Sequence, residues 1–199
     1  MKPDYYYPVK PEQVNRVWGF YDPQDYSQFG FTNHNGVDWA PGADKLWRYP
    51  WSGTGTVIRV GNQPQGGGIF CGIISNELFD FPDGKQAYIL TDALHAEKIL
   101  VKEGDIVKTG DPIIIQDNTG FSTGIHTHEQ DRREEWIENA QASPSAYRNQ
   151  SGMVLTDVDK NDANNSFNPL DYATGGYAYQ LQEIGLLQKV VDLLKQLLK

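Results

Sequence analysis

The chain has 199 residues and a formal net charge of −9, from 17 Lys and Arg against 26 Asp and Glu. This length suits one medium domain with a hydrophobic core, and 39% hydrophobic residues argue against a disordered chain. The single cysteine excludes an internal disulfide and a cysteine-rich zinc site, so a transition-metal site must use histidines and carboxylates. The acidic balance disfavours nonspecific binding to nucleic acid.

The beginning of the chain, residues 1–13, lacks the apolar stretch after basic residues that marks a secretory signal. No window of the sequence is apolar over the length that a membrane span requires. The first thirty residues are rich in Tyr, Pro, Asp and Gln and show no helical period. We therefore expect a soluble protein without a visible export signal, whose irregular first segment packs aromatic side chains onto a later core.

Between residues 53 and 123 the pattern becomes that of strands. Short apolar segments alternate with turns rich in Gly and Asp, and they predict strands at 56–60, 69–74, 86–90, 99–101, 106–107 and 113–115. Such closely spaced strands indicate an all-β core, an antiparallel β-sandwich or partial barrel with irregular loops. We expect Cys71, within one of these segments, to be a buried and unreactive thiol.

Three further segments carry weaker predictions. Residues 45–53 hold Trp47, Tyr49 and Trp51, which either line a substrate cleft or pack in the core. The stretch 129–150 looks like a loop or insertion, with a short charged helix at 132–141. The polar stretch 157–166 shares some spacing with a calcium loop but lacks its glycine and its final glutamate, so a solvated turn is favoured.

The last residues, 179–199, have the pattern of an amphipathic helix about 30 Å long. Apolar residues recur at alternating intervals of three and four, and a second apolar stripe runs beside them. Five charged residues argue against a membrane span. Three alternatives stay open for the apolar face: packing on the rest of the chain, self-association, and binding to a membrane surface. We divide the chain into a domain at 1–178 and this helix at 179–199.

The four histidines occupy informative positions. His126 and His128 are two residues apart, so on a strand both imidazoles point to the same face. His34 and Asp38 are four apart, and Asn35-Gly36 between them favours a strand or turn over a helix. His34, Asp38 and one histidine of the later pair make a plausible three-ligand zinc set that leaves a fourth position open. The alternatives are histidines exposed at a strand end and a local hydrogen bond in a turn.

Taken together, the motifs resemble those of the lysostaphin-type zinc endopeptidases, across residues 27–128. The resemblance rests on HNGVD at 34–38, the Gly-Thr-Val at 55–57, His95 ahead of VKEGDIVKTGDPI at 101–113, and TGFSTGIHTH at 119–128. The order and spacing of these segments match the family pattern.

The resemblance implies one Zn²⁺ per chain, bound by His34, Asp38 and His128. It also implies that His95 and His126 are catalytic residues beside the water that the metal activates. We expect His126 to act as the general base and His95 to stabilise the oxyanion.

Two departures from the family pattern concern neighbours of these histidines. Ala93 stands where the family usually has a tyrosine, two residues before His95. Thr127 and Glu129 flank His128 where the family has apolar residues, and we expect them to alter the floor of the substrate groove.

The function implied by the resemblance is hydrolysis of peptide cross-links or stem peptides of bacterial peptidoglycan. One rival is a non-catalytic scaffold of the same family. The other is a biotinyl- or lipoyl-carrier module, which 101–113 also resembles but which needs a modified lysine in an exposed hairpin. Because a cell-wall enzyme acts outside the cytoplasm and no signal peptide is visible, we expect a phage lysin or virion component, or a shortened chain.

Overall fold

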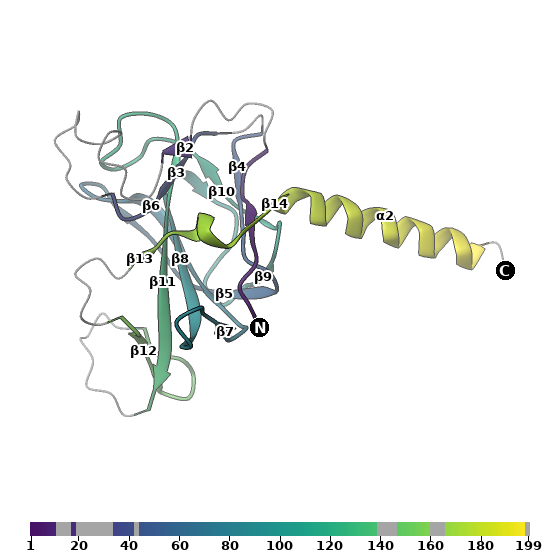
Figure 1. The fold of residues 1–199 in the computed structure, drawn as a ribbon. Coiled ribbons are helices and arrows are strands. Elements are labelled where there is room, and N and C mark those ends of the chain that lie inside the picture. Colours follow the sequence, from purple (N-terminus) through teal and green to yellow (C-terminus); the bar gives the residue numbers. More distant parts are fainter. Residues whose placement is uncertain (11–16, 19–33, 42–43, 139–146, 160–165, 198–199) are drawn as a thin grey trace.

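A computed structural model describes residues 1–10, 17–18, 34–41, 44–138, 147–159 and 166–197. It shows a β-rich body from which one long helix projects (Figure 1). The main sheet is antiparallel, in the strand order β2–β3–β11–β8–β6–β5–β9. The bounds of these strands are β2 (Val17–Trp18), β3 (Val37–Trp39), β11 (Thr127–Ile137), β8 (Gln86–Ile99), β6 (Gly68–Ser75), β5 (Thr54–Gln63) and β9 (Ile106–Lys108).

Shorter strands extend this sheet along its two longest members. β10 (Pro112–Gln116) pairs with the far end of β8 and with β4 (Leu46–Arg48), while β7 (Phe79–Asp80) pairs with the beginning of β8. β12 (Val154–Asp157) and β13 (Ser166–Phe167) both pair with β11. The sheet does not close into a barrel, and the predicted all-β core is confirmed. The segment expected at 86–90 is the beginning of the long strand β8, which ends at Ile99, so residues 100–101 of the segment expected at 99–101 lie beyond it.

The two ends of the body meet in a separate two-stranded sheet. β1 (Tyr5–Tyr7) runs parallel to β14 (Ala173–Tyr177), which follows a 3₁₀ turn, η3 (Pro169–Tyr172). The expectation of an irregular first segment was therefore wrong for β1, because its partner strand lies at the other end of the sequence. The expected packing of an aromatic side chain is found, since Tyr5 is fully buried and its ring lies 4.9 Å from that of Trp51.

The predicted helix at 132–141 is wrong, because β11 continues through Ile137, and residues 139–146 lie outside the described part of the chain. Polar residues occupy both faces of β11 and conceal its alternation. His128, Gln130 and Arg132 lie on the outer face, whereas Thr127, Glu129 and Asp131 point into the core and are at most 1% exposed.

Two carboxyl groups of β11 that point into the core, those of Glu129 and Asp131, accept hydrogen bonds from core side chains, although Asp131 Oδ2 has no partner. Glu129 accepts from the Tyr5 hydroxyl at 2.8 Å and from Trp47 Nε1 at 3.0 Å. Asp131 accepts from Trp51 Nε1 at 2.9 Å and from Thr91 Oγ1 at 2.5 Å. Burial, together with the neighbouring carboxylate, raises the pKa of Glu129 well above its usual range, which favours a protonated Glu129.

These contacts decide between the alternatives for the aromatic segment 45–53. The side chains of Trp47, Tyr49 and Trp51 are fully buried in the core, so they pack there and line no cleft. Cys71 is also fully buried, and burial raises the pKa of its thiol to about 12, which confirms the prediction of an unreactive cysteine.

The polar stretch after β12 begins as a turn tied to the body. Asp159 makes ion pairs with Arg133 at 2.6 Å and with Lys85 at 3.1 Å, so its carboxylate already has cationic partners. Residues 160–165, which complete the stretch considered as a calcium loop, lie outside the described residues.

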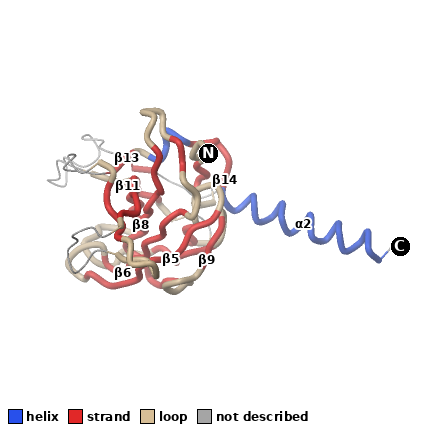
Figure 2. Tube along the Cα trace, turned by 90° about the horizontal axis from the view of Figure 1, so that it is seen from below, coloured by secondary structure: helices blue, strands red, loops and turns tan. Residues whose placement is uncertain are grey.

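The chain ends in α2 (Ala178–Leu197), which follows β14 and extends away from the body (Figures 1 and 2). Ala178, at the beginning of the helix, is buried, whereas the large apolar residues further along it are exposed. Among the described residues, no helix combines the length and hydrophobicity that crossing a membrane requires. The division of the chain between residues 178 and 179 stays a prediction.

The buried Glu129 generates a test of the polar core. Glu129→Leu removes the acceptor of the Tyr5 and Trp47 donors and is expected to lower the free energy of unfolding by about 2–4 kcal/mol. Glu129→Gln keeps an amide oxygen as acceptor and is expected to stay within about 1 kcal/mol of the wild type near pH 5. Urea denaturation of the metal-free proteins measures both changes.

The same pair of proteins tests the raised pKa of Glu129. A carboxyl whose pKa is higher in the folded state destabilises the fold as pH rises above its unfolded value, about 4.3. Glu129→Gln removes this dependence, so its stability relative to the wild type should increase between about pH 5 and about pH 8. A constant difference across this range would contradict a protonated Glu129.

Candidate metal centre

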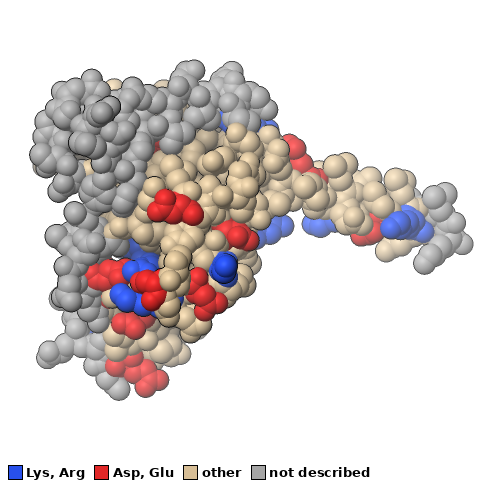
Figure 3. Space-filling view, viewed as in Figure 1, with Lys and Arg blue, Asp and Glu red and all other residues tan. Residues whose placement is uncertain are grey.

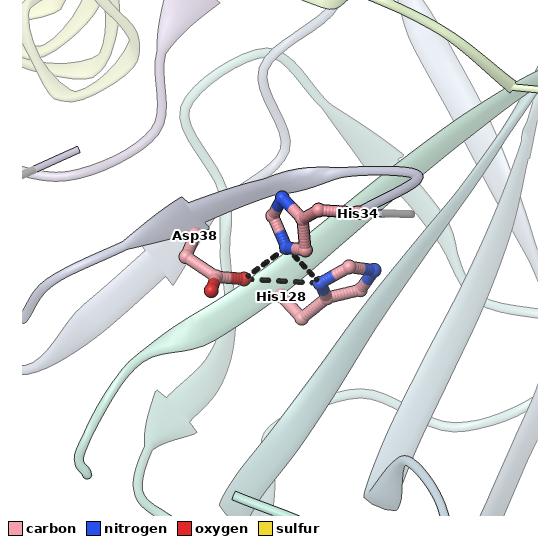
Figure 4. Close-up of side chains that lie close together, drawn as sticks. All are labelled: His34, Asp38 and His128. Atoms are coloured by element: carbon pink, nitrogen blue, oxygen red, sulfur yellow. Dashed lines mark hydrogen bonds and ion pairs between the residues drawn. The ribbon is translucent and has the colours of Figure 1, made fainter. Parts of the chain in front are cut away.

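Three side chains converge at the edge where β3 meets β11 (Figure 4). His34 Nε2 lies 3.1 Å from Asp38 Oδ1 and 3.0 Å from His128 Nδ1, and His128 Nδ1 lies 3.0 Å from Asp38 Oδ1. The register of the sheet places Asp38 directly opposite His128, and His34 lies just before β3. These are the three residues expected to bind the metal.

The donor set and its spacing fit a zinc ion. Zinc takes imidazole nitrogens and carboxylate oxygens at ~2.0–2.1 Å, and two such ligands at tetrahedral positions lie about 3.3 Å apart. The three observed separations of 3.0–3.1 Å are within a few tenths of an ångström of that value. Three protein ligands would leave one position of a tetrahedral ion open, which is typical of catalytic sites.

The electrostatics of the three residues favour an ionised aspartate. Burial alone raises the pKa of Asp38, but hydrogen bonds from His128 and His34 outweigh burial and hold this pKa well below its usual range. Asp38 is therefore a carboxylate at neutral pH and supplies the negative charge that a divalent cation requires.

Gly36 permits the close approach of this segment to β11. A Cβ atom at this position would lie 2.3 Å from the backbone oxygen of Glu129 and 2.7 Å from the ring of His128. A larger residue would therefore push the ring of His128 away from His34 and Asp38. This close approach explains on steric grounds why the HNGVD motif has a glycine at position 36.

His126 lies just before β11, beside the three converging residues. Its Nε2 atom is 3.6 Å from Asp38 Oδ1, and its Nδ1 atom lies 2.8 Å from the backbone oxygen of Gly124. Because a carbonyl oxygen only accepts hydrogen bonds, Nδ1 carries the hydrogen. In the neutral ring, Nε2 therefore presents a lone pair on the side of Asp38.

His95 reaches the same place through an irregularity in β8. Between Ala93, which pairs with Cys71, and Ala96, which pairs with Ile69, β8 contains one more residue than β6, so the register shifts. His95 adopts a φ of 68°, in the left-handed region that non-glycine residues rarely occupy. The bulge turns this side chain toward the site, as β-bulges commonly do near functional groups.

Thr119 fixes the orientation of the His95 ring. Its backbone oxygen accepts from His95 Nδ1 at 2.8 Å, and its hydroxyl bridges Ala96 and Ile69 by donating to one backbone oxygen at 2.8 Å and accepting from one amide at 3.0 Å. Nδ1 of His95 therefore carries the hydrogen, as it does in His126. The His95 ring centroid lies 4.8 Å from that of His126 and 6.3 Å from that of His128.

Burial lowers the pKa of His95 to about 4, and the neighbouring histidines add to this effect. The structure thus brings all five predicted site residues together: His34, Asp38, His95, His126 and His128.

The expected influence of Thr127 and Glu129 on the groove floor was wrong. Both side chains alternate with His128 along β11, so they point into the core and away from the site. Ala93 is likewise fully buried, in register with Glu129 and Cys71. These departures from the family pattern change the core rather than the surface beside the metal ligands.

Sequence reasoning assigned no role to two residues that hold the catalytic candidates in place. Thr119 anchors His95, and Ser122 Oγ lies 3.3 Å from His126 Nδ1 while donating to the Gly124 backbone oxygen at 2.8 Å. Both belong to the TGFSTG segment at 119–124, so this motif could have indicated that they position the two histidines.

Gly36→Ala tests the steric account of the centre. We expect the displaced His128 ring to weaken zinc affinity by at least about tenfold, measured by titration against a chromophoric chelator. Gly124→Ala is the matched control, because a Cβ at Gly124 meets no atom within 4 Å. Equal zinc affinity in both variants would contradict the account.

Comparison with known proteins yields likenesses at the level of sequence and of fold, although no family model matches the chain. An uncharacterized metalloprotease of Buchnera aphidicola subsp. Baizongia pistaciae is 34% identical over 89 residues, which cover 42% of this chain and 23% of that protein. The match therefore spans less than a quarter of that relative's length.

Three solved structures give partial matches. A zinc-containing peptidase from Vibrio cholerae is 28% identical, with a TM-score of 0.48, over 64% of this chain and 36% of its own. The catalytic domain of the antimicrobial peptidase lysostaphin from Staphylococcus simulans is 23% identical, with a TM-score of 0.47, over 86% and 90%.

The third structure, the SpoIIQ–SpoIIIAH pore-forming complex, is 18% identical, with a TM-score of 0.50, over 87% of this chain and 92% of its own. At this identity the likeness concerns the fold alone. The sequence likeness to a metalloprotease agrees with the reaction class that the motifs indicated.

Proposed function

We propose that this chain is a zinc-dependent endopeptidase that hydrolyses peptide cross-links or stem peptides of bacterial peptidoglycan. The observation that carries the proposal is the triangle of His34 Nε2, Asp38 Oδ1 and His128 Nδ1, with sides of 3.0–3.1 Å, beside two further histidine rings. The sequence likeness to a metalloprotease supports the reaction class. The substrate class comes from the family resemblance of the motifs.

In this proposal His34, Asp38 and His128 hold the zinc ion. Zinc in such a site polarises the scissile carbonyl and lowers the pKa of water toward ~7. His126 accepts a proton from the attacking water at Nε2, since its Nδ1 hydrogen is already donated to Gly124. We assign the general base to His126 because its Nε2 atom lies 3.6 Å from Asp38, next to the ligand atoms.

His95 complements His126 as its neighbour, with the two ring centroids 4.8 Å apart. Its Nε2 atom also carries a lone pair in the neutral ring, so it donates a hydrogen bond only after it gains a proton. Two neighbouring imidazolium rings repel each other, and the pair therefore holds one proton more readily than two. The one proton of this pair would come from the attacking water through His126. On His95 it would hydrogen-bond the developing oxyanion, and from either ring it would then pass to the leaving amine.

The proposal extends to the place of action. A peptidoglycan substrate lies outside the cytoplasm, so the protein acts on the cell wall, as a phage lysin or virion component would. Its net charge of −9 gives no attraction to an anionic wall. Recognition of the substrate therefore depends on the side chains around the metal centre.

A non-catalytic scaffold is the second candidate, favoured by the fold likeness to a component of a pore-forming complex. Such a scaffold needs the fold but has no need of the proton-transfer histidines. The two candidates differ in whether the folded, zinc-loaded chain releases amines from cell walls.

The central experiment incubates the purified protein with isolated cell walls of several cross-link types and measures released amino groups. His34→Ala is expected to lose both stoichiometric zinc and activity. His126→Ala and His95→Ala should keep about one zinc per chain and lose about 10²–10⁴-fold in rate. A zinc-loaded wild type that cleaves none of the walls would favour the scaffold, and activity that survives in His34→Ala would exclude the proposed centre.

Thr119→Val tests how His95 is positioned. Removing the hydroxyl bridge between Ala96 and Ile69 should let the carbonyl that holds His95 Nδ1 move. We expect kcat to fall by about tenfold with KM and zinc content unchanged. Thr119→Ser keeps the hydroxyl and should restore most of the rate; a defect equal in both variants would contradict this role.

A further inference from the structure

The helix α2 carries an apolar face that the rest of the described chain leaves exposed. Its large aliphatic residues are 42–67% exposed: Ile184, Leu186, Leu187, Val190, Val191, Leu193 and Leu194. Figures 1 and 2 show the helix extending from the body, and Figure 3 shows few charged side chains along it in that view. A contiguous apolar surface of this kind on a monomer marks an interaction site.

The body contacts α2 at its first turn, where Ala178 is buried and Lys10 Nζ lies 5.0 Å from the centre of the Tyr179 ring. Beyond this turn a hollow lies between the helix and the body, lined by Leu181, Leu186 and Lys189 on the helix and by Lys108 and Thr109 on the body. Packing of the helix onto its own domain, one of the three expected alternatives, therefore leaves most of the apolar face exposed among the described residues.

The choice and spacing of the apolar residues match those of helices that pair with copies of themselves. Ile184 and Val191 are β-branched and seven residues apart, and Leu187 and Leu194 each follow one of them by three residues. A 3-4 repeat with β-branched residues at one core position and leucine at the other is the preferred core of self-associating coiled coils.

The apolar face of α2 is also wider than the narrow stripe that a two-stranded coiled coil buries. At 100° per residue, the second stripe of Leu186, Val190 and Leu193 broadens the apolar arc to about 180°. Burial of an arc this broad requires a partner helix, or several, along most of its length.

The polar side of α2 argues against a membrane surface as the occupant. It carries both signs of charge, with Asp192 placed between Lys195 at 3.9 Å and the Gln188 amide at 2.9 Å. Helices that bind membrane surfaces combine a strongly basic polar face with Trp or Phe on the apolar face, and α2 contains no Trp or Phe. The acidic chain further disfavours anionic lipid.

We propose that copies of this chain associate through the apolar face of α2, with Ile184, Leu187, Val191 and Leu194 at its centre. The helix, about 30 Å long, holds the acidic bodies away from the interface. Their mutual repulsion is screened over about 8 Å at physiological ionic strength. Association should therefore persist, or strengthen, as salt is raised.

Sedimentation equilibrium of the zinc-loaded, full-length protein tests this from about 1 μM to about 100 μM. At the upper concentration we expect a mass at least twice the monomer mass of 22.4 kDa. Leu187→Glu with Leu194→Glu places two charges at the centre of the face and should weaken association by at least about 100-fold. Leu187→Ala with Leu194→Ala keeps strong helix formers and should weaken it by at least about tenfold.

The matched control lowers the net charge by the same two units on the polar side, as Lys189→Glu, and should associate like the wild type. Circular dichroism and zinc content verify that helix and body are retained. The proposal is overturned if the wild type stays at 22.4 kDa throughout, or if the polar-side control dissociates as much as the Leu→Glu variant. A monomer that co-sediments with phosphatidylglycerol vesicles would assign the face to membrane instead.

Discussion

The register between β3 and β11 is the constraint on which the candidate site depends. Because Asp38 lies directly opposite His128, the carboxylate and the imidazole meet without any loop to position them. His34 precedes β3 in the same segment as Asp38 and lies 3.1 Å from it, and Gly36 lets this segment approach β11 closely. A slip by one residue would send His128 into the core and Glu129 toward the metal ligands, since neighbouring side chains on a strand point to opposite faces.

The polar core beneath the site reinforces that register. Glu129 bonds to Tyr5 and Trp47 from the face opposite His128, so β11 is held from both sides of the sheet. A buried carboxyl group costs free energy unless its hydrogen bonds are satisfied, and only one register satisfies them here. Placing acids in the core costs free energy, but it also disfavours every other pairing of β11. The candidate metal ligands need this one pairing in order to meet.

The sequence predicts which residues gather at the candidate metal centre better than it predicts the surrounding fold. Even spacings, two for His126 and His128 and four for His34 and Asp38, imply common faces on strands. The structure brings both members of each pair to the site, although His126 and His34 lie just before β11 and β3 rather than on them. His95 follows from no such rule, because an extra residue in β8 and a left-handed backbone redirect it, and only the family resemblance indicated it. The polar residues on both faces of β11 likewise hid a strand from any pattern based on alternating hydrophobicity.

The pairing of β1 with β14 determines when this protein can finish folding. The Thr174 hydroxyl donates to the Tyr5 backbone oxygen across 169 residues of sequence, and Tyr5 in turn holds Glu129 beside His128. During translation, the first strand therefore waits for nearly the whole domain to leave the ribosome before its neighbour exists. Contacts this distant in sequence slow folding, and in the interval the aromatic side chains of the core lack their cover. A fragment limited to the motif-bearing residues 27–128 would lack both strands, so we expect the minimal domain to need both ends of the body.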